Sequence, residues 1–242
     1  CLCCLSAIVC ADVKTLIDSA GQKYMNGDFQ KAAQLYDSVL KSGYIAPEVY
    51  YNLGNAYFKT NDIPKALLNY ERARMLDPGD EDINYNIKYV NQFVTDKIEP
   101  IPEFFLNRWI KSVEDAFSSN AWAVIALLAF VIVLMLIAWF LFTRRSLFKR
   151  LTFWTAILVL LMSVFSVAFS IRQYNQLHAR DTAIVFTPSV TVKSSPDMSG
   201  TSLFVIHEGL KVEITDRIGE WVEVRLPNGN KGWMKTEDLE VV

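Results

Sequence analysis

Two apolar runs, Ala121–Phe142 and Leu151–Ile171, constrain the fold of this chain more than any other feature. Each run has about 21 residues without a single Asp, Glu, Lys, Arg or His, and a helix of that length measures roughly 32 Å, which is enough to cross the hydrocarbon core of a bilayer. The connecting segment, residues 143–150, is too short to cross the membrane again. The second run must therefore return to the side from which the first came, and the sequence predicts a two-helix transmembrane hairpin.

The charges of the connecting segment predict how the hairpin is oriented. All four of them are positive, and they belong to Arg144, Arg145, Lys149 and Arg150. Because basic loops stay on the cytoplasmic side of a membrane, residues 143–150 are expected to be cytoplasmic. Both termini of such a two-pass protein would then lie outside the cytoplasm.

The first residues, CLCCLSAIVCADV, are typical of the apolar core of a secretory signal. Val9 and Ala11 fit a cleavage site after Ala11, which predicts a signal peptide over residues 1–11. No Met and no basic segment precede this core, so we expect the signal to be truncated at its N-terminus. A lipid-modified Cys10 or Cys4 and an uncleaved anchor are alternatives, and each of them would also export the region that follows.

Residues 12–97 show a helical pattern that repeats with a spacing of 34 residues, as residues 13–46 align with residues 47–80. Thirty-four residues is the period of the tetratricopeptide repeat, an α-helical pair. The first copy is degenerate, and residues 81–94 start a third first-helix that the following Pro residues cut short, which predicts a capping helix. The second copy resembles the tetratricopeptide consensus at Leu53, Gly54, Tyr57, Ala66, Tyr70, Ala73 and Pro78.

Stacked repeats of this kind have a concave surface lined by the first helix of each repeat, and peptides usually bind there. The residues predicted to face this surface and to bind a peptide are Asn52, Asn55, Lys59, Asn86 and Tyr89. Asn52 and Asn86 match across the 34-residue period, which favours a shared role. Two alternatives stay open, namely that these side chains are simply solvated, and that the shared role of Asn52 and Asn86 is hydrogen bonding between repeats.

Residues 98–120 lead from the repeat domain to the first apolar run. The sequence Glu-Pro-Ile-Pro-Glu in this segment is typical of a stiff linker. From Phe104 onward, aromatic and aliphatic residues recur at helical spacing, opposite Lys111, Glu114 and Asp115. An amphipathic helix next to a membrane span is expected to lie at the membrane interface. Packing beneath the repeat domain is the alternative.

Small residues recur along one side of the second apolar run. Ala156, Ser163 and Ser170 are seven residues apart, and Ser166 lies beside them. Small side chains let another helix approach closely, so these four positions are predicted to pack against a helix. That helix could be the first span or a helix of a partner protein.

After residue 181 the hydrophobic pattern changes from helical to alternating. Six short β-rich runs within residues 182–242, with a hairpin signal at Asn228-Gly229, predict a small all-β barrel. The order of Val, Gly, Pro and Trp residues resembles that of bacterial SH3 domains. The residues that carry this resemblance are Val190, Val192, Pro196, Gly209, Val212, Gly219, Trp221, Val224, Gly229, Gly232 and Trp233.

Three side chains of this barrel suggest a binding groove at first sight. Because one face of the barrel has to be filled, we interpret Trp221 and Trp233 as core or half-buried residues. His207 stands alone before a turn, and we interpret it as a surface or hydrogen-bonding residue.

No catalytic, cofactor-binding or metal-ligating residues are predicted. All four cysteines lie in the first ten residues, the two histidines are His178 and His207, and no motif of a metalloprotease, serine hydrolase or phosphate-binding loop is found. The lack of ionisable residues in the apolar runs also argues against a transporter or pump. The flanking regions have no basic stretch with which to bind nucleic acid.

The order of signal, tetratricopeptide repeats, hairpin and SH3-like domain resembles the BatE type of aerotolerance (Bat) proteins of Bacteroidetes. The resemblance implies a complex with other Bat membrane proteins, which bear von Willebrand A domains, and a link to oxygen or stress tolerance. We therefore expect a multi-domain membrane protein that is a non-catalytic scaffold, anchored in the lipid bilayer, with protein, peptide or peptidoglycan partners. The alternative is a cell-wall targeting protein that binds peptidoglycan and recruits a wall enzyme.

Overall fold

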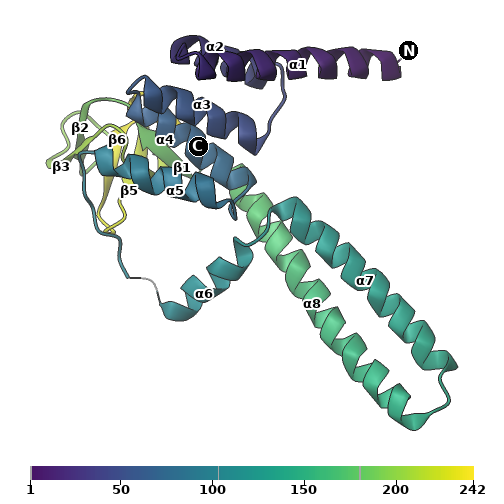
Figure 1. The fold of residues 1–242 in the computed structure, drawn as a ribbon. Helices are drawn as coiled ribbons and strands as arrows, with labels where there is room; N and C mark the ends of the chain where they lie inside the picture. Colours follow the sequence, from purple (N-terminus) through teal and green to yellow (C-terminus); the bar gives the residue numbers. More distant parts are fainter. Residues whose placement is uncertain (1, 103, 180) are drawn as a thin grey trace. The chain divides into compact units, whose positions relative to one another are not determined.

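The computed structural model describes residues 2–102, 104–179 and 181–242, with side chains from residue 12 onward, and the chain divides into two compact units. The first unit combines the N-terminal helices with the C-terminal sheet, and the second unit is Phe104–Ala179 (Figure 1). Cys1, where the predicted signal begins, lies outside the described residues, as do the side chains of residues 2–11. The signal peptide therefore stays a prediction.

The N-terminal part of the first unit is a series of helices that pack in chain order. The helix pairs α1–α2 and α3–α4 correspond to the two predicted repeats, and α5 corresponds to the predicted capping helix. The bounds are α1 Leu2–Met25, α2 Phe29–Lys41, α3 Pro47–Lys59, α4 Ile63–Leu76 and α5 Glu81–Val90, and the 3₁₀ helix η1 follows at Asn91–Phe93.

The turns inside the two helix pairs are built alike. Gly27 and Asn61 adopt the same left-handed backbone conformation, with φ of 81° and 62°. The next residue in each turn, Asp28 or Asp62, caps the following helix by accepting a hydrogen bond from a backbone N–H three residues on. The 34-residue period of the sequence is thus also a period of the structure.

Gly54 sits where α3 crosses α4. A Cβ at this position would come within 2.8 Å of the Tyr70 ring and 3.2 Å of the Ala66 carbonyl oxygen. Tyr70 and Ala66 are themselves fully buried, so neither has room to move aside. Only glycine lets the two helices approach this closely.

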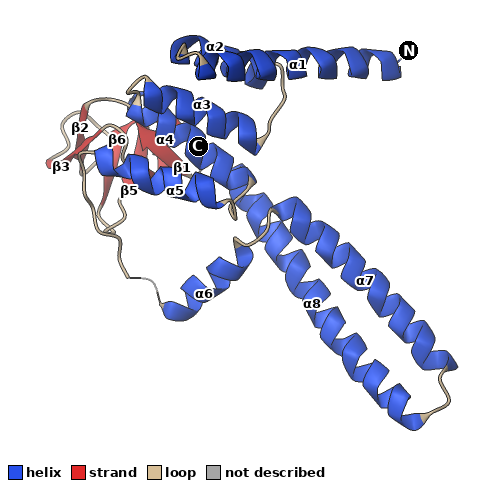
Figure 2. Ribbon diagram, in the orientation of Figure 1, coloured by secondary structure: helices blue, strands red, loops and turns tan. Residues whose placement is uncertain are grey.

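The C-terminal part of the first unit is an antiparallel sheet, shown in red in Figure 2. Its strand order is β3-β2-β6-β5-β4-β1-β7. Val192, Val224 and Met234 lie in its core. The strands are β1 Thr182–Val185, β2 Ser189–Lys193, β3 Ser202–His207, β4 Lys211–Ile218, β5 Trp221–Arg225, β6 Lys231–Lys235 and β7 Leu239–Val241, with the 3₁₀ helix η2 at Thr236–Asp238.

The strand β7 is absent from the six β-rich runs that the sequence indicated. It has only three residues, which is too short for an alternating pattern to stand out. It pairs with β1, and the Asp238 carbonyl just before it accepts a hydrogen bond from the Phe186 N–H. Its place at the edge of the sheet therefore depends on a partner strand more than 50 residues earlier in the chain.

The sheet packs against α4 and α5 of the same unit. Ile184, Phe186 and Val242 join a hydrophobic cluster whose other members include Val90 and Val94. In a longer array of repeats, this flank of α4 and α5 would be covered by another second helix. Here the β-domain covers it instead.

Polar contacts surround this interface between the helices and the sheet. Glu71, which is only 3% exposed, accepts a hydrogen bond from the Lys211 ammonium group at 2.8 Å and is also paired with Arg74. Arg72 donates to the carbonyl oxygen of Val241 at 2.8 Å.

After α5, Asp96 accepts hydrogen bonds from both the backbone N–H and the ring of His207. The ring nitrogen Nδ1 of His207 lies 2.9 Å from the Asp96 carboxylate. His207 is therefore a hydrogen-bonding residue of the interface.

The second unit consists of α6 Phe105–Glu114, α7 Ser119–Phe142 and α8 Ser146–Ala179. Among the described residues, α7 and α8 are the helices long and apolar enough to cross a membrane, and they form a hairpin (Figure 1). The non-helical connection is shorter than the predicted segment 143–150, because α8 already begins at Ser146. The first turns of α8 therefore contain Lys149 and Arg150. The sequence prediction began the helix later because hydropathy identifies the apolar middle of a helix and not its polar ends.

The predicted fold class is confirmed for its repeat-like helical region, its two long apolar helices and its antiparallel β-domain.

We predict that Gly54→Ala destabilises the repeat domain by about 1–3 kcal/mol, because the added methyl group overpacks the α3–α4 crossing. Thermal unfolding of the full chain in detergent, followed by circular dichroism, measures the effect. The matched control is Gly21→Ala, where the nearest atom to the new Cβ is the Tyr36 hydroxyl at 3.9 Å. This control should be neutral or stabilising. Equal stability of the two variants would contradict the prediction.

A second prediction concerns the interface between helices and sheet. Glu71→Ala leaves Lys211 and Arg74 without their shared carboxylate, and because both cations are about one-third exposed, we expect a loss of about 1–2 kcal/mol, less than for a fully buried pair. Proteolysis in the linker before residue 102 should become faster as the sheet detaches. Glu208→Ala removes an exposed carboxylate nearby and serves as the control. A proteolysis rate unchanged from that of the control would show that Glu71 does not hold the interface.

Candidate functional site

Exposed aromatic side chains line one side of α5 and η1. Tyr85, Tyr89 and Phe93 recur every four residues and are 66%, 41% and 53% exposed. Phe58 of the neighbouring helix α3 completes the group, with its ring centroid 5.7 Å from that of Tyr89 and 5.5 Å from that of Phe93. We call Phe58, Tyr85, Tyr89 and Phe93 the aromatic surface. It joins the first helix of the second repeat to the capping helix.

Hydrogen bonds between amides and tyrosines hold α3, α4 and α5 together next to this surface. The Asn86 amide donates to Asn55 Oδ1 and to the Tyr51 hydroxyl oxygen, both at 3.1 Å. The Tyr70 hydroxyl donates to the same Asn55 oxygen at 2.7 Å. Asn55 therefore accepts hydrogen bonds from two other helices, and the surface rests on a fixed support.

Burial keeps the Tyr70 hydroxyl in its donor form. Desolvation, with smaller contributions from Tyr51 and Tyr24, raises the pKa of Tyr70 far above its ordinary value. The pKa of Tyr57 is raised for the same main reason, and its hydrogen bond to Asp37 adds to the effect. Both hydroxyls stay protonated at any physiological pH. The support of the aromatic surface is thus insensitive to pH.

The predicted peptide-binding residues separate into three groups. Asn86 hydrogen-bonds to Asn55 and not to Asn52, with which it was expected to share a role, and Tyr89 belongs to the aromatic surface. Asn52 is half-buried and Lys59 is exposed on α3, and within the described part of the chain neither is hydrogen-bonded to the other predicted residues. The sequence reasoning missed Tyr85 and Phe93, although the spacing of four residues between positions 85, 89 and 93 is visible in the sequence.

The two tryptophans of the β-domain lie on the outer face of its sheet. Strand alternation places Val222, Val224 and Met234 in the core, so that Trp221 and Trp233 point outward and are half-buried. They do not fill the barrel. The inner face is already filled by smaller aliphatic side chains.

The β-domain also has a hollow of about 590 Å³ between its strands and the linker. Lys211, Arg225 and Lys231 line it together with Glu213, which is ion-paired with Arg225. Ile101 of the linker lies at its edge, where its backbone N–H donates to the Pro227 carbonyl oxygen at 3.1 Å. The hollow is open, and each of its basic side chains is ion-paired, Lys211 with Glu71, Arg225 with Glu213 and Lys231 with Glu223.

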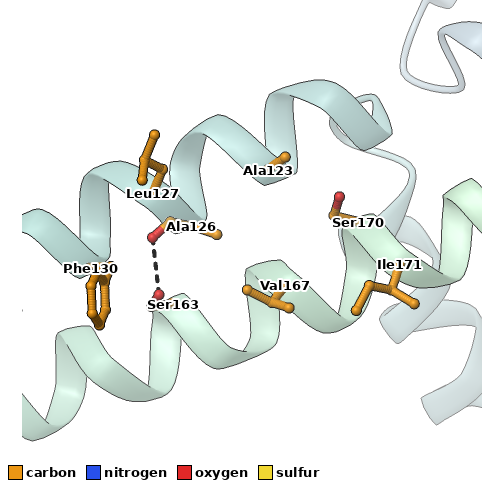
Figure 3. Close-up of a pocket in the computed structure, with 8 residues that line it drawn as sticks. All are labelled: Ala123, Ala126, Leu127, Phe130, Ser163, Val167, Ser170 and Ile171. Atoms are coloured by element: carbon orange, nitrogen blue, oxygen red, sulfur yellow. Dashed lines mark hydrogen bonds between the residues drawn. The ribbon is translucent and has the colours of Figure 1, made fainter.

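Two of the small residues of the second apolar run, Ser163 and Ser170, face α7 within the hairpin (Figure 3). Ser163 donates to the Ala126 carbonyl oxygen at 3.0 Å. Ser170 and Ser119 donate to each other's backbone carbonyl oxygens at 3.0 and 2.9 Å. Ser166 is buried and bonds within its own helix, and Ala156 is half-buried. Two of the four predicted packing positions thus make hydrogen bonds across the hairpin.

The described residues contain no group of three or more His, Cys, Asp or Glu side chains arranged to hold a metal ion. The polar side chains described above make structural hydrogen bonds. What the aromatic surface offers is a binding face.

Comparison with known protein families identifies two domains. A family model for the tetratricopeptide repeat matches residues 47–80, and a model for the bacterial SH3 domain matches residues 188–240. No curated protein matches the chain. The chain therefore contains a tetratricopeptide repeat and a bacterial SH3 domain, and the two matches coincide with α3–α4 and with the greater part of the antiparallel sheet.

We predict that Ser163→Leu separates α7 from α8, because a large side chain cannot fit where the hydroxyl reaches the Ala126 carbonyl. Ser163→Ala should cost only about 0.6 kcal/mol, which is the typical value of a hydrogen bond between helices in a membrane. Disulfide trapping between cysteines introduced at Ala123 and Val167 reports the distance between the helices. The control is Val164→Leu on the exposed side of α8. Undiminished trapping in Ser163→Leu would contradict the close packing.

Proposed function

We propose that the protein is a non-catalytic scaffold of the bacterial inner membrane, in which the α7–α8 hairpin is the anchor and the first unit binds partner proteins in the periplasm. The aromatic surface carries this proposal. It offers four aromatic side chains without a charged group among them, so it suits a partner segment with apolar or aromatic side chains. The β-domain packs on α4 and α5 through other side chains and leaves Tyr85, Tyr89 and Phe93 exposed.

The exposure of the two long helices supports the anchor. In the most apolar 18-residue stretch of each helix, only 17% is buried in α7 and only 11% in α8. A core helix of a water-soluble protein is mostly buried. Large apolar side chains such as Leu134 and Leu161 remain uncovered. A bilayer would cover all of them at once.

The packing of the first unit supports the two-pass topology. Residues on both sides of the hairpin meet in this unit, since Glu71 binds Lys211 and Asp96 binds His207. These contacts favour a topology in which both flanks lie on the same side of the membrane. The basic connection Arg144-Arg145 favours the cytoplasm for the other end, which leaves the first unit in the periplasm.

The partners in this proposal are other membrane proteins of a Bat-type complex that bear von Willebrand A domains, and the complex is linked to oxygen or stress tolerance. The order of repeat, apolar hairpin and bacterial SH3 domain is what supports this finer assignment.

A second candidate function is cell-wall targeting, in which the bacterial SH3 domain binds peptidoglycan and the repeats recruit a wall enzyme. The observation that favours it is the open hollow of the β-domain, where Lys231 and Arg225 would exchange their carboxylate partners Glu223 and Glu213 for carboxylates of wall peptides.

We predict that Tyr89→Ala combined with Phe93→Ala lowers recovery of partner proteins at least tenfold when the full chain is purified from membranes in mild detergent and analysed by mass spectrometry. Removal of two aromatic side chains from the centre of a binding surface typically has an effect of this size. The control is Tyr44→Ala, which removes an exposed tyrosine outside the aromatic surface. Thermal unfolding of all variants tests whether each variant retains the fold.

The same preparations separate the two candidate functions. Partner recovery that is equal for the double variant and the control would contradict binding at the aromatic surface. Co-sedimentation of the unchanged chain with purified sacculi, lost on Lys231→Glu, would favour the wall-targeting function instead.

A further inference from the structure

The helix α6 has two sharply different sides. At 100° per residue, Phe105, Leu106 and Trp109 share one side with Ile110 and Val113. The opposite side carries Asn107, Arg108, Lys111, Ser112 and Asp115. No apolar residue of the helix interrupts the polar side. A helix with its side chains separated in this way can place one side in an apolar phase while the other side stays in water.

The apolar side of α6 is uncovered within its unit. Phe105 is 72% exposed, Trp109 is 65% exposed and Leu106 is 45% exposed. Phe104, just before the helix, is 62% exposed and packs only on the Phe105 ring, at 4.6 Å between centroids. Apolar surface of this size is a site of contact with a partner or a lipid phase.

The C-terminal end of α6 is fixed to the start of the hairpin. The Glu114 carbonyl oxygen accepts hydrogen bonds from the Gln173 amide at 2.6 Å and from the Trp122 indole at 2.9 Å. Gln173 also donates to the Phe117 carbonyl oxygen at 3.0 Å. Both long helices therefore hold the turn after α6, at the end of the hairpin where α7 begins.

Charges gather at the same level. The Glu114 side chain is only 2% exposed, and its Oε1 atom lies 3.5 Å from Arg172, whose own side chain is 61% exposed. Burial raises the pKa of Glu114, and Arg172 opposes that shift. Arg172 and Lys111 both act on the Glu114 carboxylate, so two cationic groups lie at the end of the hairpin. Lipid phosphates lie at this level when the apolar runs fill the hydrocarbon core.

We propose that α6 lies in the headgroup layer of the membrane, with Phe105, Leu106 and Trp109 in the acyl chains and with Arg108 and Lys111 at the lipid phosphates. The inference rests on the membrane anchor of the proposed function. The occupant of the apolar side is the bilayer, because this side continues the uncovered apolar surface of the hairpin and because the turn after Glu114 holds it at the hairpin's end. The Gln173 and Trp122 hydrogen bonds set the depth at which the helix sits.

Site-directed spin labelling of the full chain tests this placement. The four native cysteines are replaced by serine, and single nitroxide labels are attached at Phe105→Cys, Trp109→Cys, Asn107→Cys and Lys111→Cys, in nanodiscs of phosphatidylcholine and phosphatidylglycerol. Collisions with oxygen report lipid, and collisions with a water-soluble nickel chelate report water. A fifth label at Leu161→Cys marks the middle of the α8 apolar run.

We expect labels at positions 105 and 109 to collide mainly with oxygen, labels at 107 and 111 mainly with nickel, and the label at 161 with oxygen alone. Nickel access at 105 and 109 combined with a lipid-exposed label at 161 would overturn the placement of α6 while leaving the anchor intact. Labels at 105 and 109 that are shielded from both reagents would show that protein covers this side, and would also overturn it. Nickel access at 161 would overturn the membrane anchor itself.

Discussion

The uncovered flank at the end of a short repeat array is the constraint on which the first unit depends. Each repeat buries its apolar face only against its neighbours, so the last helix of an array exposes apolar side chains unless something caps it. In this chain α5 has no second helix after it, and Ile184, Phe186 and Val242 of the β-domain complete its hydrophobic cluster. The cap is thus a separate domain, which follows the hairpin in the sequence.

The β-domain leaves the aromatic surface exposed, and hydrogen bonds fix the helices that carry this surface. The β-domain contacts α4 and the segment after α5, while Asn86 ties α5 to α3 through Asn55 and Tyr51. A binding surface loses less entropy when its side chains are already held in place. The aromatic surface has this property, since Tyr85 stacks on Tyr89, Phe58 and Phe93 contact Tyr89 edge to face, and the helices beneath them are joined by hydrogen bonds.

Local features of the fold were predictable from the sequence, and contacts between distant segments were not. The turns at Gly27-Asp28 and Asn61-Asp62 and the apolar runs depend on neighbouring residues, so periodicity and turn chemistry indicate them. In the sequence, Glu71 looks like an ordinary solvated charge on a helix. Its buried ion pair could not be predicted, because its partner Lys211 comes 140 residues later. In the candidate site, Tyr89 was expected to bind a peptide together with Asn55 and Asn86, and that role stays a prediction. The hydrogen bond between the two amides was not expected, because it depends on how α3 and α5 pack.

The polar groups of the hairpin form hydrogen bonds within the hairpin, and this affects which part of the chain can bind a partner. Ser163, Ser170 and Ser119 direct their hydroxyls to backbone carbonyl oxygens across the α7–α8 contact. These groups are therefore not available to pair with a partner helix in a bilayer, where polar contacts are the main source of specificity between helices. What the hairpin presents outward is aliphatic and aromatic surface that lipid covers equally well. The proposed recognition of partners therefore falls to the first unit, which combines aromatic rings, amides and charges.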